Sequence, residues 1–322
     1  MSTPGLSPAL AALNRIAIIG TGLIGASVAA ALKSRGFSGT IVGCARSQQT
    51  LDKAIELGLA DEVQRDVKDA VNGADLVLLA VPMMAGRDLL QQMAPVLKPG
   101  CIVTDGGSVK GSFIEDARHA LGSLVQVVPA HPIAGKEFSG VEAADPSLYF
   151  GHTVILTPDE TTNSEAIETV AALWRECGAI VEIMSSRDHD KVLAATSHMP
   201  HLVAFSVVDM LSRHSSRENV FKYSAGGFRD FTRIASGDPE MWRDICLCND
   251  EEIGEILDNL IEHLSGVRQL VANKQGAELE KIFENSKKTR DGLIEKYDKA
   301  RLAQTRARSD QPERTDKAGR KH

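Results

Sequence analysis

Residues 15–25 read RIAIIGTGLIG, and this stretch decides the fold class. An apolar run leads directly into the pattern G-x-G-x-x-G, and an amphipathic segment follows over 23–34. In a strand–turn–helix unit, the first glycine permits a tight turn, the second lets the backbone approach a pyrophosphate, and the third lets helix and strand pack closely. The N–H groups at the helix start then face the phosphates. We therefore predict a dinucleotide-binding loop that consists of Gly20, Gly22, Leu23, Ile24 and Gly25.

The alternation of strands and helices continues to about residue 184. Short apolar runs that are typical of buried strands occupy 15–19, 40–45, 76–80, 101–105, 125–129, 153–157 and 180–184. Segments with helical spacing lie between them, such as 23–34, 84–97 and 164–177. Because continuous apolar strands alternating with helices indicate a parallel sheet covered on both faces, we predict an α/β fold. Residues 14–184 are expected to form a doubly wound, Rossmann-type NAD(P)-binding domain.

The pattern changes at Ser185, after which the sequence predicts only helices. SSRDHDKV has a hydroxyl cap with an acid three residues later, Asp238-Pro239 is a second helix start, and Asn249 with Glu252 suggests a capping box. An apolar stripe on one helix face then consists of Ile253, Ile256, Leu257, Leu260, Ile261, Leu264, Val267 and Leu270.

The stripe fits packing within one chain or a helix-on-helix dimer interface. The limited core of an all-helical domain over 185–297 favours the second choice, so we expect a homodimer. Residues 298–322 are basic and nearly free of large apolar side chains, and they are expected to be a disordered tail.

Bulk composition excludes several classes of function. The net charge is −7 with 25% charged residues, so nucleic-acid or anionic-membrane binding has no electrostatic support. The apolar runs are too short to span a bilayer, and the N-terminus lacks the features of a signal peptide. Five cysteines, an odd count without a metal-ligand spacing, indicate free thiols in a reducing cytoplasm. We expect a cytoplasmic protein that binds a small molecule and has no metal site.

The end of the second predicted strand bears on the choice of nucleotide. About 20 residues past the last glycine, an NAD site usually has Asp or Glu to bind the ribose 2′-hydroxyl. Ala45 stands there instead, and Arg46 and Ser47, which follow it, can both hold a 2′-phosphate. This pattern favours NADP modestly over NAD, although Arg46 as an ordinary surface charge fits the sequence nearly as well.

Three segments are predicted to meet at the carboxyl edge of the sheet, where ligands bind in such folds. Val81-Pro82 follows the third strand beside the expected path of the nicotinamide ribose, DGGSVK (105–110) ends the fourth, and His131 follows the fifth. Ser108 and His131 are thus expected neighbours. A histidine after a strand is most often an ordinary loop residue. Oriented by a hydroxyl, however, a neutral ring with a pKa near ~6.5 can take a proton from an alcohol while a hydride leaves the same carbon.

Two motifs of the helical part add candidate ligand-binding groups. His198 and His201 in SHMPH (197–201) share a helix face that the proline between them should kink. Core or capping roles suit these histidines as well as a ligand role, and no metal-ligand spacing surrounds them. In GGFRDFTR (226–233), Arg233 or Arg229 can clamp a carboxylate, with Arg229 better suited to a local ion pair.

These motifs are similar to those of the prephenate/arogenate dehydrogenase family of tyrosine biosynthesis. The resemblance spans about 14–295 and rests on GTGLIG (20–25), DGGSVK (105–110), HPIAG (131–135), SHMPH (197–201) and GFRDFTRIA (227–235), in that order. It implies an NAD(P)-dependent oxidative decarboxylation of prephenate to 4-hydroxyphenylpyruvate, or of arogenate to tyrosine. It also implies a Rossmann domain followed by a helical dimerisation domain.

The resemblance also implies roles for single residues. His131 resembles the catalytic histidine that hydrogen-bonds the ring hydroxyl, and Ser108 the serine that supports it near the nicotinamide. Arg233 resembles the arginine that holds a substrate carboxylate, while His201, with Ser197 of the same motif, lines that pocket.

Two other functions stay open at this point. The first is a β-hydroxyacid dehydrogenase of the 6-phosphogluconate type, which would use Lys191 as its base although DHDKV looks solvated. The second is a nucleotide-sensing regulator without turnover, which needs the glycine-rich loop but not His131, Ser108 and Arg233 together.

Overall fold

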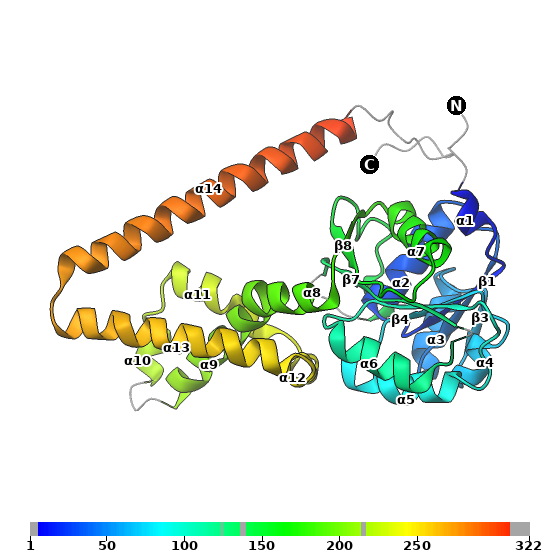
Figure 1. Cartoon of the computed structure of the whole chain (residues 1–322), viewed down its shortest axis with the longest axis horizontal. Helices are drawn as coiled ribbons and strands as arrows, with labels where there is room; N and C mark the ends of the chain where they lie inside the picture. Colours follow the sequence, from blue (N-terminus) through cyan, green and yellow to red (C-terminus); the bar gives the residue numbers. More distant parts are fainter. Residues whose placement is uncertain (1–5, 124, 136–139, 214–216, 310–322) are drawn as a thin grey trace. The chain divides into compact units, whose positions relative to one another are not determined.

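The chain folds into two units, Met1–Ile256 and Leu257–His322, each described by itself. The structure is a computed structural model, and it describes residues 6–123, 125–135, 140–213 and 217–309. The first unit contains the sheets and most of the helices (Figure 1). No helix within those ranges is long and apolar enough to cross a membrane.

A parallel sheet of six strands forms the centre of the first unit, in the order β3-β2-β1-β4-β5-β6. Its strands are β1 (Arg15–Ile19), β2 (Thr40–Cys44), β3 (Glu62–Gln64), β4 (Leu76–Leu79), β5 (Ile102–Asp105) and β6 (Gln126–Val128). The order reverses between β1 and β4, so the loops after these strands meet at the switch point where doubly wound folds bind ligands. The predicted fold class is confirmed. β3 escapes sequence analysis because it is short and has only one apolar residue.

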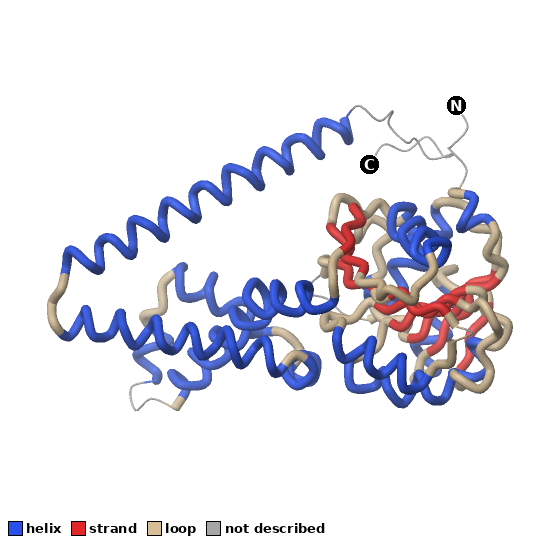
Figure 2. Tube along the Cα trace, viewed as in Figure 1, coloured by secondary structure: helices blue, strands red, loops and turns tan. Residues whose placement is uncertain are grey.

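Helices cover both faces of this sheet (Figure 2). Alternate strand side chains enter different cores: Ile16 and Ile18 pack with α2 and α7, while Ala17 and Ile19 pack with α4, α5 and α6. The helices of this part are α1 (Pro8–Ala11), α2 (Leu23–Ser34), α3 (Gln48–Glu56), α4 (Val67–Val71), η1 (Met83–Ala85), α5 (Gly86–Met93), α6 (Gly111–Ala120), η2 (Val141–Ala143) and α7 (Ser164–Glu176).

A second, smaller sheet contains His131, which the sequence instead places in a loop beyond the fifth strand. This sheet consists of β7 (Ala130–Pro132), β8 (Thr153–Leu156) and β9 (Ile180–Ile183). β7 pairs antiparallel with β8, so His131 lies opposite Ile155, and β8 pairs parallel with β9. The expectation of one parallel sheet through residue 184 is therefore wrong. Pro129 has no N–H to donate, so the ladder of β6 ends at Val128 and the chain enters the second sheet.

The described chain beyond β9 is helical, as the sequence predicts. Its elements are α8 (Ser186–Leu193), η3 (Ala194–His198), α9 (Met199–Ser212), α10 (Arg217–Lys222), α11 (Gly226–Thr232), η4 (Arg233–Ser236), α12 (Pro239–Cys248), α13 (Asp250–Ala272) and α14 (Gly276–Ser309). The side chains of Ser185 and Asp238 cap α8 and α12. η3 is a π-helical turn that ends two residues before Pro200, whose missing N–H interrupts the helix ladder.

Two details of the helical part bear on the sequence-based expectations. Asn249 directly precedes α13, and its side-chain nitrogen donates to the carbonyl oxygen of Asp190 and to the ring of His198. α14 continues to Ser309, so residues 298–309 are helical rather than disordered. Alanine, leucine, lysine and arginine in this segment are strong helix formers, a property that its charge does not reveal. Residues 310–322 lie outside the described residues.

Candidate active site

The glycine-rich loop has the shape that a bound pyrophosphate requires. Gly20 has a φ of 96°, and a Cβ added to it would lie 2.2 Å from the carbonyl oxygen of Ala80. A Cβ on Gly25 would lie 2.2 Å from the carbonyl oxygen of Gly20. At Gly22, which caps α2 without a side chain, the same atom would meet nothing within 4 Å. Two glycines thus permit close backbone packing, and the third leaves room before the N–H groups of α2, so the loop fits a dinucleotide.

The loop after β5 contacts both the dinucleotide loop and the strand of His131. A Cβ on Gly106 would lie 3.1 Å from Cγ2 of Ile24 and 3.8 Å from Cδ of Pro132. A Cβ on Gly107 would lie 2.5 Å from Sδ of Met83, which directly follows Val81-Pro82. The segments of Ile24, Pro82, Ser108 and His131 therefore lie together at the carboxyl edge of the large sheet.

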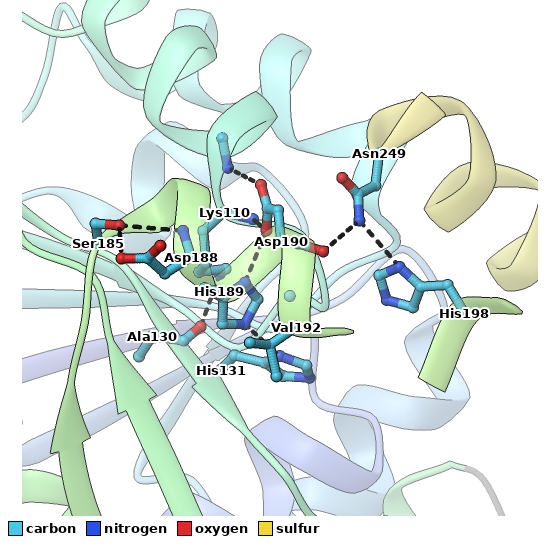
Figure 3. A network of polar contacts seen from close by, with 12 residues as sticks. Lys110, Ala130, His131, Ser185, Asp188, His189, Asp190, Val192, His198 and Asn249 are labelled. Atoms are coloured by element: carbon cyan, nitrogen blue, oxygen red, sulfur yellow. Dashed lines mark hydrogen bonds and ion pairs between the residues drawn. The ribbon is translucent and has the colours of Figure 1, made fainter. Parts of the chain in front are cut away.

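His131 belongs to a buried cluster of polar side chains (Figure 3). The residue is 9% exposed, and Nδ1 of its ring lies 2.8 Å from Nε2 of His189 on α8. Nδ1 of His189 in turn lies 2.7 Å from Oδ1 of Asp190. Sequence analysis missed both partners, since the only signal is the His-Asp pair within DHDKV, 58 residues along the chain from His131.

Asp190 is held by the start of α6. Its Oδ1 accepts the backbone N–H of Lys110 at 2.9 Å, and its Oδ2 accepts that of Gly111 at 2.7 Å. Burial by itself would raise the pKa of the Asp190 carboxyl, but hydrogen bonds from His189 and these two N–H groups hold that pKa below its ordinary value. Asp190 is therefore an anion that can only accept, and Nδ1 of His189 donates to it.

A buried ion pair lies beside this array. The side chain of Lys110 is fully buried, pairs with Oδ2 of Asp105, and donates to the carbonyl oxygen of Ala130 at 2.7 Å. Oδ1 of Asp105 accepts the backbone N–H of Ala130 at 3.0 Å. The pair thus joins the end of β5 to the residue immediately before His131.

Two buried histidines near this pair, His131 and His198, are neutral at neutral pH. Burial holds the pKa of His131 well below its ordinary value, and the nearby His189, Lys110 and His198 lower it further. Burial also lowers the pKa of His198 to about 4, against the opposing effect of Asp190. Because its ring is neutral, His131 can accept a proton at neutral pH.

The motif residues of the helical part lie around Trp242. The ring of His201 stacks on Trp242 with centroids 3.8 Å apart, and its Nδ1 donates to the carbonyl oxygen of Ser197 at 2.8 Å. Trp242 also packs with Val109, the neighbour of Ser108 in the loop after β5. This cluster connects SHMPH to the carboxyl edge of the large sheet.

The arginines that the sequence proposes for anion recognition are exposed. Arg233 begins η4, which packs against α9, the helix of His201, and Arg229 lies one turn earlier on α11. Arg46 follows β2 and is exposed, whereas Ser47 caps α3 by accepting a backbone N–H of its first turn at 3.4 Å. The hydroxyl proton of Ser47 is still available for a ligand.

A dinucleotide loop at the switch point of a parallel sheet, with a neutral histidine beside it, defines the class of NAD(P)-dependent dehydrogenases. The family follows from comparison with known proteins. The model described as "Prephenate dehydrogenase, nucleotide-binding domain" matches residues 28–183, and "Prephenate dehydrogenase, dimerization domain" matches residues 185–285. The chain belongs to the prephenate dehydrogenase family, which confirms the resemblance of its motifs.

This chain aligns with most of the length of several named relatives. The cyclohexadienyl dehydrogenase of Zymomonas mobilis is 42% identical over 88% of this chain and 98% of its own. The prephenate dehydrogenase of Bacillus subtilis is 36% identical over 87% and 76%, respectively. A crystal structure of prephenate dehydrogenase from Aquifex aeolicus, in complex with hydroxyphenyl propionate and NAD+, is 37% identical. It aligns with a TM-score of 0.82 over 87% of this chain and 98% of that one.

Proposed function

We propose that this protein catalyses the NAD(P)-dependent oxidative decarboxylation of prephenate, or of arogenate, with His131 as the base. The observation that carries the proposal is the placement of a buried, neutral His131 beside the loops of the dinucleotide site. Its Nδ1 is occupied by His189 at 2.8 Å, which leaves Nε2 for a substrate. The family and the names of its relatives support the same reaction.

The chemistry of prephenate needs few protein groups. Prephenate has a ring carboxylate and a hydroxyl at opposite ends of a cyclohexadiene, and the oxidised nucleotide, when bound, supplies the hydride acceptor. Loss of hydride from the hydroxyl carbon gives a vinylogous β-keto acid, which loses CO₂ and becomes aromatic. Because aromatisation drives the reaction, the protein must mainly provide a base, a cation for a carboxylate and a fixed substrate position.

Each candidate residue takes one of these tasks in the proposed mechanism. His131 removes the hydroxyl proton at Nε2, Ser108 supports it near the nicotinamide, and Arg233 holds a substrate carboxylate. His201 and Ser197 line the substrate pocket. The cofactor would be held by Gly20, Gly22, Leu23, Ile24, Gly25, Arg46, Ser47, Val81 and Pro82.

We further propose that NADP is used at least as well as NAD. The end of β2 offers no carboxylate at Ala45, whereas the exposed Arg46 follows it directly. Sγ of Cys44 lies 3.9 Å from the backbone oxygen of Arg65, which brings a second arginine to the same strand end. An arginine at this strand end favours a 2′-phosphate over a hydroxyl.

The rival functions fit the structure less well. The side chain of Lys191, the base of a β-hydroxyacid dehydrogenase, is 62% exposed and its Nζ lies 3.8 Å from Glu255. Lysines that act as bases are buried, and the exposed side chain of Lys191 lacks that environment. A nucleotide sensor has no use for a buried neutral histidine with an ordered hydrogen-bond partner.

We also propose a homodimer built from domains 14–184 and 185–297. Residues 185–285 match the family's dimerization domain. On α13, Ile261 is 60% exposed and Leu264 is 54% exposed, so a single chain leaves part of the apolar stripe open to solvent. The five cysteines are free thiols, which fits the cytoplasm as the proposed location.

Steady-state assays that cross prephenate and arogenate with NAD and NADP test the proposed activity. At least one of the four combinations should give reduced nucleotide and CO₂ in equal amounts. A panel of β-hydroxyacids serves as the control and should give neither product. Turnover of a hydroxyacid, without turnover of prephenate or arogenate, would overturn the proposal.

A further inference from the structure

The hydrogen bonds of the array formed by His131, His189 and Asp190 determine where its protons lie. The anionic Asp190 accepts from Nδ1 of His189, so a neutral His189 presents the lone pair of Nε2. That lone pair lies 2.8 Å from Nδ1 of His131. With His189 neutral, two lone pairs would repel at this distance, so this arrangement places the proton on Nδ1 of His131. The lone pair of His131 is then on Nε2, where a base needs it.

The other polar groups around His131 act on its charge rather than on its tautomer. Lys110 from the start of α6 is paired with Asp105 of β5 and bonded to Ala130, not to the imidazole. His198 of η3 accepts a hydrogen bond from Asn249 at 3.1 Å. These groups keep His131 neutral, but they leave open which of its two nitrogens is protonated.

We propose that His189 and Asp190 are positioning residues for His131: Asp190 fixes the tautomer of His189, and His189 fixes the tautomer and direction of His131. The inference rests on the proposed role of His131 as the base. Neither residue is expected to touch the substrate, since each acts through the next ring.

The array also accounts for the proton after the reaction. The hydroxyl proton moves to Nε2 of His131 while the electron pair of the C–H bond leaves as hydride toward the oxidised nucleotide. The proton on Nδ1 of His131 can then pass to Nε2 of His189 along the 2.8 Å hydrogen bond. Asp190 stays ionised throughout, so the positive charge comes to lie next to a carboxylate.

Long-range ¹H–¹⁵N spectra of histidine-labelled protein test the tautomer without substrate or nucleotide. The signals of His131 are those lost in His131→Asn, among the nine histidines of the chain. In the wild type, Nδ1 of His131 should be protonated and Nε2 should not. In His189→Leu, which removes the acceptor, a large share of His131 should have its proton on Nε2. His189→Gln offers an amide oxygen as acceptor and should restore the wild-type tautomer.

Kinetics should follow the spectra. His189→Leu should lower kcat at least about tenfold, with little change in the KM for prephenate. The loss should stay below the about 10⁴-fold loss that a wrong histidine tautomer causes in a Ser-His-Asp triad. His189→Gln should recover most of this loss. His119→Leu, an exposed histidine on α6, is the matched control and should change neither the spectra nor kcat.

The outcomes separate this inference from the proposed function. A wild type with His131 protonated on Nε2, or a His189→Leu variant with an unchanged His131 tautomer, would overturn the positioning role even if the enzyme is active. If His189→Leu does not fold, the wild-type spectrum still decides. If the spectra are as expected but neither substrate is turned over, the proposed reaction is refuted and the tautomer assignment stands.

Discussion

Replacing His131 by Asn should remove the base and keep the hydrogen bond that holds it. The amide nitrogen of an asparagine occupies about the place of Nδ1, so it can still donate to Nε2 of His189, now 2.8 Å from the imidazole. No atom of the new side chain reaches the place of Nε2. The buried cluster should therefore stay assembled, because its ion pair and the anchor of Asp190 do not involve residue 131.

The expected loss follows from the step that is removed. General-base catalysis contributes about 10²- to 10⁴-fold, so kcat should fall by that factor, which corresponds to about 2.7–5.4 kcal/mol in the barrier. The KM for prephenate should change little, since binding of the carboxylates does not depend on His131. The measurement is steady-state reduction of nucleotide at saturating substrate, with the exposed His119→Asn as the matched control.

The pH profile of the wild type gives an independent reading of the same group. A base acts only when unprotonated, so kcat/KM should fall as pH decreases through the pKa of His131 in the free enzyme. Burial, followed by His189, Lys110 and His198, holds that pKa well below its ordinary value. The acidic limb should therefore lie below ~6.5, the pKa of an unperturbed histidine and the value that the sequence alone predicts. In His131→Asn the limb should be absent.

Two results would refute this reasoning. Near-normal kcat in His131→Asn, with the acidic limb retained, would show that another group is the base, and His201 would be the next residue to replace. A wild-type limb at or above ~6.5 would show that burial does not control the charge of His131.

Four further predictions follow from other parts of the molecule. Arg233→Ala should raise the KM for prephenate about 10- to 150-fold with a smaller change in kcat, and a raised KM only in Arg229→Ala would reassign the carboxylate clamp. Arg46→Ala should weaken the binding of NADP in fluorescence titrations and leave the binding of NAD nearly unchanged. A wild type that does not bind NADP would show that Arg46 is only a surface charge. Light scattering at micromolar concentration should report about twice the chain mass of 34.6 kDa, and a monomer would contradict the dimer. Lys110→Met should lower the free energy of unfolding in urea by about 3–5 kcal/mol at fixed protein concentration, because Asp105 stays buried without its cation. The exposed Lys191→Met should change it by less than about 0.5 kcal/mol.

Features with local signals were predicted correctly from the sequence. RIAIIGTGLIG forms a strand, a glycine-rich turn and a helix because each step depends on neighbouring residues. The caps at Ser185 and Asp238 likewise need only a side chain and an N–H three residues away. The change from an α/β part to a helical part was visible for the same reason.

The environment of His131 could not be predicted because its partners are distant in sequence. β7 is three residues long and ends in proline, so it has no measurable period. Lys110 looks like a surface residue, and nothing nearby in the sequence indicates that β5 and β7 enclose it. The local pattern of Asn249 places it correctly, directly before α13, but does not reveal that its side-chain nitrogen donates to His198 and Asp190 across the fold.

Asp190 links the orientation of the base to the packing of the whole first unit. α6 begins without a capping side chain of its own, and its first N–H groups need acceptors. The carboxylate of Asp190 supplies them from α8, and the same carboxylate orients His189 toward His131. A Cβ on Gly111 would lie 2.9 Å from Oδ2 of Asp190, so even this close approach depends on a glycine.

The residues that Asp190 joins lie in the two regions of the chain that match different family models. β7 and α6 lie within the match to the nucleotide-binding domain at 28–183, and α8 lies within the match to the dimerization domain at 185–285. His131 is therefore held in its proposed catalytic tautomer only while α8 packs against α6 and β7. A substitution that loosens this packing reduces the population of correctly oriented His131 without altering any ligand contact. Such a change lowers kcat and leaves KM in place, because only the fraction of molecules with a competent base is reduced.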